Sequence, residues 1–391
     1  MIRVGFLLNF QDQGWIGGIN YYHSLIDAVM STPDRKIEPV IITGTRLDLP
    51  FIKDHPEIEI VRTKIFDRPL SFVRVGIHKL LSYDLILEQL LKKHCIDVLS
   101  HSGYVFHDAS IPTVGWIPDF QHKHLPDFFS DEEVRSRDIA FERICRLCSC
   151  IIFSSSSAKG DAEEYYPKYK SNYEKLHFVS VPMNPKNVPD ISILKGKYPI
   201  SEPYFLIPNQ FWAHKNHRAV LEALNILHSQ NKRVRVICTG NTHDYRNPEH
   251  YNSLIEFATQ SGISDDFTVL GIVPYSDLIG LMMHSVSLIN PSFFEGWSTT
   301  VEEAKSWGLP IILSDIPVHR EQNPAGGIYF HPKDAESLAN IMWKLWTSDD
   351  VCDRELKISS AKRELNLRKL EFGKQYENII LKTITSRYKK R

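Results

Sequence analysis

The stretch SFFEGWSTTVEEAKSWGLP, from Ser292 to Pro310, lies between two short apolar runs, VSLIN before it and IILSD after it. Each run has the length of a buried strand, and the segment between them has helical spacing. In a parallel α/β sheet, ligands bind beyond the carboxyl ends of strands, where the N–H groups of a helix N-terminus attract anions. Glu295 and Glu303, eight positions apart, are therefore predicted to face one crevice, beside Gly296 and the backbone amides of residues 297–300.

A structural interpretation of the same residues stays open at this point. Thr299 with Glu302, and Thr300 with Glu303, have the spacing of a capping box, in which the glutamate only closes the start of a helix. Spacing alone does not decide between a helix cap and a binding residue.

Length and composition bound the class of protein. A chain of 391 residues is long enough for two domains, and 42% hydrophobic with 24% charged residues is typical of a soluble globular protein. A net charge of −1 argues against general nucleic-acid binding.

The N-terminus does not read as a signal peptide and no run is long enough to cross a bilayer, which predicts a cytoplasmic protein. The six scattered cysteines are expected to be free thiols, with no metal site among them.

Strand and helix patterns alternate twice along the chain. The first series begins at IRVGFLL and YYHSLIDAVM, and the second begins at YFLIPN and VLEALNIL. Alternation of this kind predicts parallel sheets covered by helices, here as two doubly wound α/β domains. The proline-rich run MNPKNVPDISILKGKYPISEP between them is predicted to be a linker.

The acidic stretch resembles the Glu-x7-Glu signature of the retaining GT-B glycosyltransferases of glycosyltransferase family 4, with its preceding Pro-Ser, its following Glu-Ala and the later Gly-Leu-Pro. The resemblance implies that Glu295 lies near the hydroxyls of the donor sugar and that Glu303 binds the ribose. The chain departs from the family after Glu-Gly, where Trp297, Ser298 and Thr299 replace a small or apolar residue and a Gly-Leu pair. These three residues line the predicted donor site.

The same resemblance implies a domain plan. In the GT-B fold two Rossmann-like domains face each other across a cleft. The N-terminal acceptor domain is expected to span residues 1–195 and the nucleotide-sugar donor domain residues 196–371. The last helix, residues 372–391, is expected to return to the first domain.

A glycine-rich run, NFQDQGWIGGIN, follows the first predicted strand and contains Gly14, Gly17 and Gly18. Glycines let a backbone approach a ligand closely, although a plain tight turn has the same composition. The family places a glycine-rich loop here beside the donor phosphates, and so Gly17 and Gly18 join the predicted donor site.

Another candidate loop, GWIPDFQHKHLPDFFS, carries Asp119, His122 and His124 just after a strand-like run. A histidine in a cleft can act as an acid, a base or a hydrogen-bond donor. In the family a His-Asp pair sits at this strand end and the histidine contacts the sugar. Pro118 occupies that histidine's position here, which leaves open whether His122 or His124 replaces it.

The loop PNQFWAHKNH opens the second series and places Lys215 between a strand and a helix, where a point charge can meet a phosphate. In the family an arginine and a lysine five residues apart neutralise the diphosphate. Lys215 matches the lysine, but Gln210 stands at the arginine position. Neutralisation is then expected from Lys215, backbone amides and His214, with Asn209 and Gln210 beside the donor.

Residues 62–82 interleave arginines and lysines with apolar side chains. Such a run is usually a half-buried helix with a solvated face, and the alternative is a peripheral contact with an anionic membrane.

Taken together, the resemblance predicts a retaining, metal-independent hexosyltransferase. It needs no cofactor beyond its substrate, a nucleotide-diphosphate sugar, and its acceptor is a hydroxyl of a glycan or lipid-linked molecule in polysaccharide or glycolipid assembly. The predicted location is the cytoplasm, at the inner face of the membrane. Two alternatives are a sugar-nucleotide epimerase of the same fold and a non-catalytic nucleotide-sugar binder.

Overall fold

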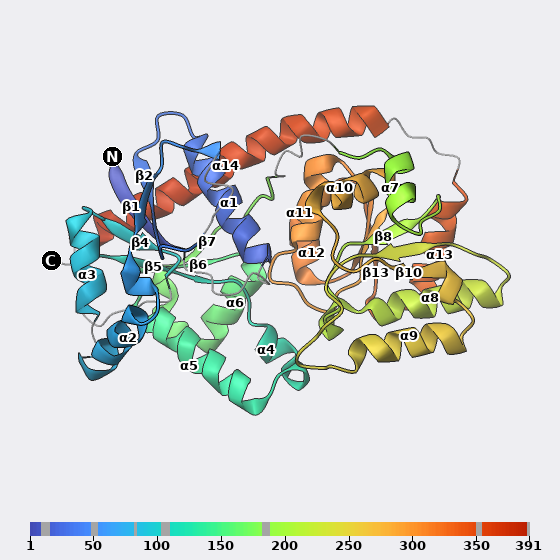
Figure 1. Ribbon diagram of the computed structural model, residues 1–391, viewed down its shortest axis with the longest axis horizontal. Helices are drawn as coiled ribbons and strands as arrows, with labels where there is room; N and C mark the ends of the chain where they lie inside the picture. The colour runs from blue at the N-terminus through green and yellow to red at the C-terminus, as the bar shows by residue number, and fades with distance from the viewer. Residues whose placement is uncertain are drawn as a thin grey trace. The chain divides into compact units, whose positions relative to one another are not determined.

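The computed structural model describes residues 1–8, 16–47, 54–81, 84–102, 110–181, 188–348 and 354–388 (Figure 1). It divides into two compact units. The first contains residues 1–120, 132–181 and 366–391, and the second contains residues 121–131 and 182–365. This division differs from the predicted boundary at residue 195, and it groups the segment 121–131 with the second unit.

The described strands of the first unit form one seven-stranded parallel sheet with the order β3-β2-β1-β4-β5-β6-β7. They are β1 (Ile2–Leu7), β2 (Ile37–Thr43), β3 (Glu59–Arg62), β4 (Val98–Ser100), β5 (Thr113–Ile117), β6 (Cys150–Phe153) and β7 (Tyr173–Lys175). The α-helices that belong mainly to this unit are α1 (Ile16–Met30), α2 (Leu70–Leu81), α3 (Leu85–Lys93), α5 (Asp131–Leu147) and α6 (Ser156–Tyr165), with 3₁₀ turns at Lys64–Phe66 and Pro167–Asn172.

The second unit has a six-stranded parallel sheet with the order β10-β9-β8-β11-β12-β13. Its strands are β8 (Phe205–Ile207), β9 (Val236–Cys238), β10 (Phe267–Val269), β11 (Leu288–Asn290), β12 (Ile311–Ser314) and β13 (Gly327–Phe330). Its helices are α4 (Gln121–His124), α7 (Ile191–Lys197), α8 (His217–Ser229), α9 (His250–Gln260), α10 (Tyr275–His284), α11 (Thr299–Trp307), α12 (Pro317–Gln322) and α13 (Ala335–Trp346), with 3₁₀ turns at Pro126–Phe128, Ala213–Lys215 and Ser264–Asp266.

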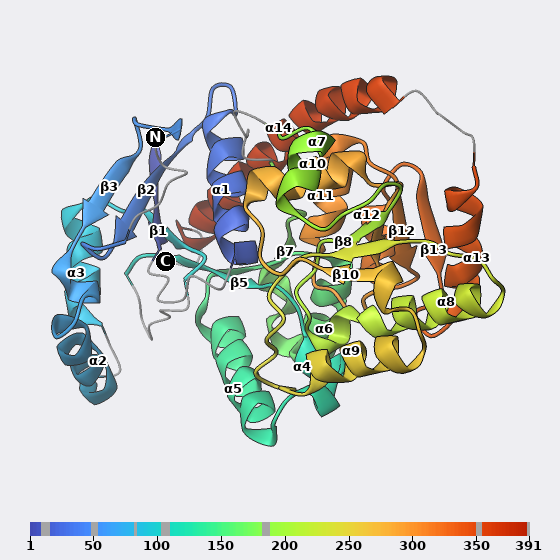
Figure 2. The same ribbon diagram turned by 45° about the vertical axis from the view of Figure 1, so that its right-hand side comes forward.

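Both faces of the second sheet are covered, which explains why its strands read as continuous apolar runs. Phe205 and Ile207 of β8 pack with α8, α9 and α13 on one face. Leu206, between them, packs with α7, α10 and α11 on the other face. Figure 2 shows these two sets of helices on opposite sides of the strands. The alternation follows from the two-residue period of a β-strand.

The linker predicted before β8 is partly a helix, and that part of the prediction was wrong. Asp190 accepts a hydrogen bond from the N–H of Ile191 at 2.7 Å and begins α7. Leu194 is fully buried in the core beside α10. The prolines that suggested a linker flank this helix rather than interrupt it.

The final helix, α14 (Arg354–Tyr388), continues from the second unit into the first. Phe372, Tyr376 and Ile380 are buried in the first unit, and the Tyr376 hydroxyl donates to Ser100 Oγ at 2.6 Å. Gly373 packs so tightly on α1 that an added Cβ would lie 2.4 Å from the Ala28 carbonyl oxygen. Among the described helices none has both the length and the apolarity needed to cross a membrane.

Candidate functional site

The strand order of the second unit fixes where a ligand can bind. β8 and β11 are neighbours, and the connections that leave them run to opposite sides, toward β9 and β12. Such a topological switch point opens a crevice at the carboxyl ends of the two strands. Asn209 follows β8 and Asn290 ends β11, so the loops that carry Lys215 and Glu295 both start at this point.

The centre of the site is an ion pair between Lys215 and Glu295. Lys215 Nζ lies 2.7 Å from Glu295 Oε1, and the Glu295 side chain is only 8% exposed. The Ser292 hydroxyl lies 2.7 Å from the same carboxylate oxygen. Burial by itself raises the pKa of Glu295, but the charge of Lys215, helped by His319 and His214, outweighs it and lowers the pKa to about 2. The carboxylate is therefore ionised at neutral pH.

Hydrogen bonds to backbone carbonyl oxygens bring Lys215 to this position. The Asn216 side chain donates to the carbonyl oxygens of Pro291 at 3.0 Å and Pro332 at 2.9 Å, while its own backbone is left-handed with φ 57°. The Phe293 N–H donates to the His214 carbonyl oxygen at 2.8 Å. The loop after β8 is thus tied to the loop after β11. Burial, followed by the neighbouring Lys215 charge, lowers the pKa of His214 to about 3, which keeps this imidazole neutral.

A buried amide and hydroxyl network supports the ion pair. Asn290 Oδ1 accepts from Asn209 Nδ2 at 3.2 Å and lies 2.7 Å from the Ser292 hydroxyl, and Asn290 Nδ2 donates to Ser298 Oγ at 2.7 Å. Asn209 Oδ1 accepts from the Thr300 hydroxyl at 2.9 Å. The side chains of Asn209 and Ser298, which the sequence placed beside the donor, are therefore used to hold the loops together.

The start of α11 excludes both capping-box interpretations. Ser298 is the N-cap, and its hydroxyl faces the Val301 N–H at 3.5 Å, so Val301 rather than a glutamate occupies the third helical position. Glu302 instead accepts from Lys305 at 3.2 Å and from Gln322 at 3.1 Å. Glu303 has no capping role.

Gln322 fixes the entry to this helix from α12. Its Oε1 accepts from the Ser298 N–H at 3.1 Å, and its Nε2 donates to the Ser298 carbonyl oxygen at 2.9 Å. The N–H groups of Thr299 and Thr300, in the first turn, remain at the open end of the helix as in any helix. Gly296 and the mostly buried Trp297 connect Glu295 to this N-terminus.

Glu303 has the opposite electrostatic character from Glu295. It is 6% exposed, and burial raises its pKa to about 7, although a hydrogen bond from the Tyr275 hydroxyl opposes the rise. Tyr275 is the first residue of α10. Near neutral pH the Glu303 carboxyl is therefore poised between its protonated and ionised forms.

The segment 121–131 distinguishes the two candidate histidines. The His124 ring lies 5.1 Å from the ring of Phe294, the residue before Glu295. His122 is fully buried, with its ring 6.4 Å from Phe129. The catalytic role of His122 stays a prediction. His124 is exposed and lies beside the acidic loop.

Three predicted site residues belong to the first unit. Gly17 and Gly18 lie in the first turn of α1, which begins at Ile16, and so are helical rather than part of a loop. Gly14 lies outside the described residues. Asp119 follows β5 and is partly buried. Their role next to a donor stays a prediction.

Sequence reasoning missed several residues of this site. Ser292 belongs to the Pro-Ser pair of the signature, but the signature gives it no role, and Asn290 could have been found as a polar residue at the end of the run VSLIN. Tyr275, His319 and Gln322 come from helices distant in sequence, and no local pattern marks them. His319 is fully buried, and one of its ring nitrogens, Nδ1, lies 2.8 Å from the Ser314 carbonyl oxygen.

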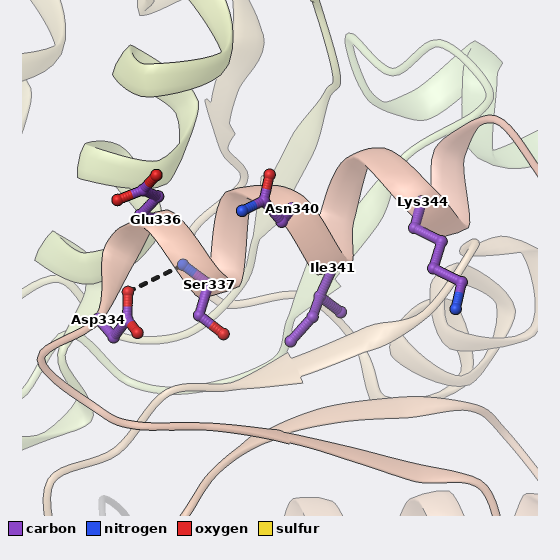
Figure 3. A pocket seen from close by; sticks show the side chains of 6 residues that line it. All are labelled: Asp334, Glu336, Ser337, Asn340, Ile341 and Lys344. Carbon is purple, nitrogen blue, oxygen red and sulfur yellow. Dashed lines mark hydrogen bonds between the residues drawn. The ribbon is translucent and has the colours of Figure 1, made fainter.

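A groove on α13 and the cysteines lie apart from this site. A shallow groove of about 400 Å³ runs along α13 and is lined by Asp334, Glu336, Ser337, Asn340, Ile341 and Lys344 (Figure 3). All six side chains come from one helix and its N-cap, and none belongs to the network around Glu295. In the part of the chain that is described, no three His, Cys, Asp or Glu side chains gather as a metal site would require. Cys145, Cys148 and Cys150 are buried free thiols, as predicted.

Known proteins resemble this chain in sequence and in fold. The family model described as Glycosyl transferases group 1 matches residues 191–364. The O-antigen chain mannosyltransferase RfbU of Salmonella typhimurium is 30% identical over 276 residues, which cover 70% of this chain and 71% of that protein. O-antigen chain mannosyltransferase B of Escherichia coli is 25% identical over 256 residues, covering 63% of this chain and 62% of that protein.

Among solved structures, HepE of Anabaena in complex with UDP and glucose superimposes with a TM-score of 0.70 at 17% identity, covering 97% of this chain and 99% of that one. Two Rossmann-like units with parallel sheets define the chain as a GT-B protein, which confirms the predicted fold class. The chain belongs to the glycosyl transferases group 1 family.

Proposed function

We propose that this protein is a retaining glycosyltransferase of glycosyltransferase family 4, which moves a hexose from a nucleotide-diphosphate sugar to a hydroxyl acceptor. The observation that carries the proposal is the ion pair between the partly exposed Lys215 and the buried Glu295, 2.7 Å apart, beside the N-terminus of α11 at a topological switch point. An ammonium has three N–H donors and Glu295 accepts one of them. Lys215 can therefore also bind a phosphoryl oxygen of the leaving diphosphate.

The chemistry follows from charge. When the bond between the sugar C1 and the diphosphate oxygen breaks, the electron pair leaves with the diphosphate and the sugar ring becomes oxocarbenium-like. Lys215 and the N–H groups of Thr299 and Thr300 stabilise the leaving group, which is the kind of electrostatic contribution that dominates many enzymes. The ionised Glu295 accepts hydrogen bonds from sugar hydroxyls and stabilises the positive ring.

In this proposal the acceptor oxygen attacks C1 from the face that the diphosphate leaves. Its proton passes to an oxygen of the leaving phosphate, so that the reaction needs neither a dedicated base, a metal ion nor a cofactor. Glu303 binds the ribose hydroxyls. Residues 196–371 act as the donor domain, and residues 1–195 with the final helix carry the acceptor and the contacts of Asp119, Gly17 and Gly18.

The sugar and the setting are proposed from the relatives. Both curated relatives named above are O-antigen chain mannosyltransferases, which supports mannose as the first sugar to test. A glycan or lipid-linked acceptor in polysaccharide or glycolipid assembly fits the same names. The protein would then work in the cytoplasm, at the inner face of the membrane.

The test combines a donor screen with product analysis. GDP-, UDP-, ADP- and dTDP-sugars are screened for thermal stabilisation, because a bound ligand raises apparent stability by mass action. The stabilising donor is then incubated with acceptor glycans in the presence of a chelator, and NMR reads the anomeric configuration of the product. Retention in the chelator supports the proposal. An inverted product, or turnover that requires added Mg²⁺ or Mn²⁺, contradicts it.

Variants of the ion pair sharpen this test. Glu295→Gln and Lys215→Met should each lower turnover by about a hundredfold or more, since removing one preorganised electrostatic partner costs about that much. Lys344→Met, in the groove along α13, is the matched control and should turn over as the wild type does. An isomerised sugar nucleotide would instead indicate an epimerase, and binding without any turnover would indicate a non-catalytic binder.

We also propose that α2 contacts an anionic membrane surface. Among residues 70–76, the part of this helix whose side chains are described, the exposed side chains are apolar, with Leu70, Phe72, Val73 and Val75 between 42% and 62% exposed. The charged residue of this stretch is buried instead, since Arg74 is 3% exposed and lies 3.3 Å from Asp84. The sequence favours a half-buried helix with its apolar side chains inside and its charged side chains in solvent. In residues 70–76 the structure has the opposite arrangement.

Charge complementarity selects the membrane as the partner of this face. Arg62, Lys64 and Arg68 are exposed in the segment leading into α2. Basic residues beside exposed apolar side chains are typical of contacts with anionic lipid. Co-sedimentation with vesicles of 70% phosphatidylcholine and 30% phosphatidylglycerol should retain the wild type and release the double variant Phe72→Ser, Val73→Ser. Leu367→Ser, exposed on α14, is the control, and equal retention of all three proteins would contradict the contact.

A further inference from the structure

Arg246 is a mostly buried cation with hydrogen-bonding capacity that is unused within the described part of the chain. Its side chain is 12% exposed, and its Nε and Nη1 atoms are buried without a hydrogen-bond partner in the described part of the chain. The nearest carboxylate oxygen, Asp244 Oδ1, lies 4.0 Å from Nε, which is too far for a hydrogen bond. Buried donors without acceptors are costly, so such a group calls for an explanation.

The carboxylate of Asp244 serves the backbone instead of this guanidinium. Its Oδ2 accepts from the Ala213 N–H at 3.0 Å, and its Oδ1 accepts from the Arg246 N–H at 3.0 Å. Asp244 therefore shapes the loop while lowering, through its charge, the cost of burying a cation nearby.

Aromatic rings hold the guanidinium in place. The Arg246 Cζ lies 4.4 Å from the ring centre of Trp212, 4.6 Å from Phe129 and 5.5 Å from Tyr245. The Trp212 indole in turn donates to Gln210 Oε1. A cation held by ring faces is attracted without using its N–H donors. The aromatic cage thus positions Arg246 and keeps those donors for another acceptor.

A cavity of about 90 Å³ lies next to the caged cation. It is lined by Asp127, Phe128, Ala213, His214, Asp244, Arg246 and Asn247. His214 connects it to the centre of the site, because its neighbour in sequence is Lys215 and its carbonyl oxygen accepts from the Phe293 N–H. His214 therefore lines the cavity and is also next in sequence to the lysine of the ion pair.

We propose that Arg246 binds a phosphoryl oxygen of a substrate at this cavity, as a second cation beside Lys215. The phosphate belongs either to the diphosphate of the donor or to the phosphate of a lipid-linked acceptor, and the inference rests on the proposed glycosyl transfer. Guanidinium pairs well with phosphate because its N–H donors match the spacing of two phosphoryl oxygens. Gln210 then contributes indirectly, by holding the Trp212 wall of the cage.

The chain supplies a matched control in Arg218. Its Cζ lies 3.6 Å from the ring centre of Phe257, but its Nε donates to Glu222 at 2.8 Å and its side chain is 46% exposed. Arg218 is thus an arginine on an aromatic ring whose hydrogen bonding is already satisfied. Arg218→Gln should leave ligand binding unchanged.

The experiment measures calorimetric affinities for inorganic pyrophosphate and for GDP, UDP, ADP and dTDP, together with the KM for the acceptor. Arg246→Gln should weaken pyrophosphate and nucleotide binding by about tenfold to a hundredfold if the phosphate is the donor's. A raised acceptor KM with unchanged nucleotide affinity assigns the phosphate to the acceptor. Arg246→Lys keeps a cation for the cage and should recover only part of the loss, because a lysine cannot bind two oxygens in the same plane.

Unchanged binding in both Arg246 variants would contradict the proposal. If Arg246→Gln and Arg246→Lys bind pyrophosphate and nucleotides as Arg218→Gln does, and the acceptor KM is unchanged, Arg246 contacts no phosphate. Should Arg246→Gln fail to fold, the lysine variant carries the comparison. Pyrophosphate binding needs no turnover, so a failure of the proposed transfer reaction can be told apart from a failure of this inference.

Discussion

Glu303 and Glu295 are two buried carboxyl groups of one loop and helix that differ chiefly in whether a cation is their neighbour. A cation lies 2.7 Å from Glu295, whereas the neighbour of Glu303 is the neutral hydroxyl of Tyr275. The pKa values move in opposite directions as a result, to about 2 and to about 7. Two carboxyl groups whose pKa values differ in this way can take different chemical roles at one pH.

Glu303→Gln separates a binding role from a structural one. The folded pKa of about 7 is above the ordinary value of 4.5, so the folded state holds this proton more tightly than the unfolded state does. The resulting stabilisation is complete below pH 4.5 and is lost as the pH rises to 7, by roughly 1.4 kcal/mol per unit of pKa difference. Glutamine is neutral at every pH. The variant should therefore melt at a higher temperature than the wild type at pH 8, and this gap should narrow toward pH 5.

The same variant should bind the donor nucleotide more weakly, by roughly 1.5 to 3 kcal/mol, because a hydrogen bond to a charged acceptor is lost. Calorimetry with the donor and differential scanning at the two pH values give both readings. A variant that is more stable at pH 8 but binds the nucleotide as before would remove Glu303 from the ribose site.

At the level of elements, the site depends on loops that side-chain hydrogen bonds connect to other loops and helices. Asn216 fastens the β8 loop, and Gln322 of α12 fastens the start of α11. Such contacts explain what the sequence could and could not predict. The strands around Glu295 were predictable because their apolar runs are continuous, and the Lys215 position was predictable because it follows the first strand of a series.

Other parts were not predictable for equally physical reasons. The prolines on both sides of α7 suggested a linker, and the only strong signals for the helix are the Asp190 cap and the single buried Leu194. The inverted burial of α2 depends on Arg74 meeting Asp84 and the ring of Phe66, a tertiary arrangement that overrides local amphipathicity. Arg246 lies in a loop without any periodic pattern, and its cage comes from three separate segments.

The contact between α14 and α1 offers a test of packing. Gly373→Ala would bring a methyl group to 2.4 Å from both the Ala28 carbonyl oxygen and the Thr32 hydroxyl, so α14 must shift. Overpacking of this kind costs about 1 to 3 kcal/mol. Gly160→Ala on α6 is the control, because an added Cβ there meets nothing within 4 Å and alanine favours a helix. Urea unfolding should show a loss for the first variant and none for the second, and equal midpoints would show that the helix contact is not tight.

At the level of the whole molecule, buried histidines set the response to acid. Burial lowers the pKa values of His101, His214 and His217 to about 3. Below the ordinary pKa of 6.5 the unfolded chain takes up protons that the folded chain refuses. Stability should therefore fall as the pH drops from 6.5 toward 3, by up to about 1.4 kcal/mol per pH unit for each histidine. Glu303 acts in the opposite direction between pH 7 and 4.5 but is a single group.

Urea unfolding at pH 7.5, 6.5 and 5.5 measures this slope. The imidazole of His217 stacks on Phe211, with ring centres 4.1 Å apart. His217→Phe keeps an aromatic ring at this position but removes the group that titrates, so it should reduce the slope of stability against pH. Midpoints that stay level between pH 7.5 and 5.5 would show that these imidazoles are not buried in their neutral form.

The division of α14 between the units also has a consequence for synthesis on the ribosome. The first unit contains residue 1, yet its core also includes Phe372, Tyr376 and Ile380, which are synthesised after every segment of the second unit. The second unit, by contrast, has all its segments once residue 365 has left the exit tunnel. We expect this arrangement to reverse the usual order, in which the N-terminal domain folds first. Until the last turns of α14 have been synthesised, the nascent first unit exposes the apolar surface that this helix will cover. We expect chaperones to bind that apolar surface during this interval.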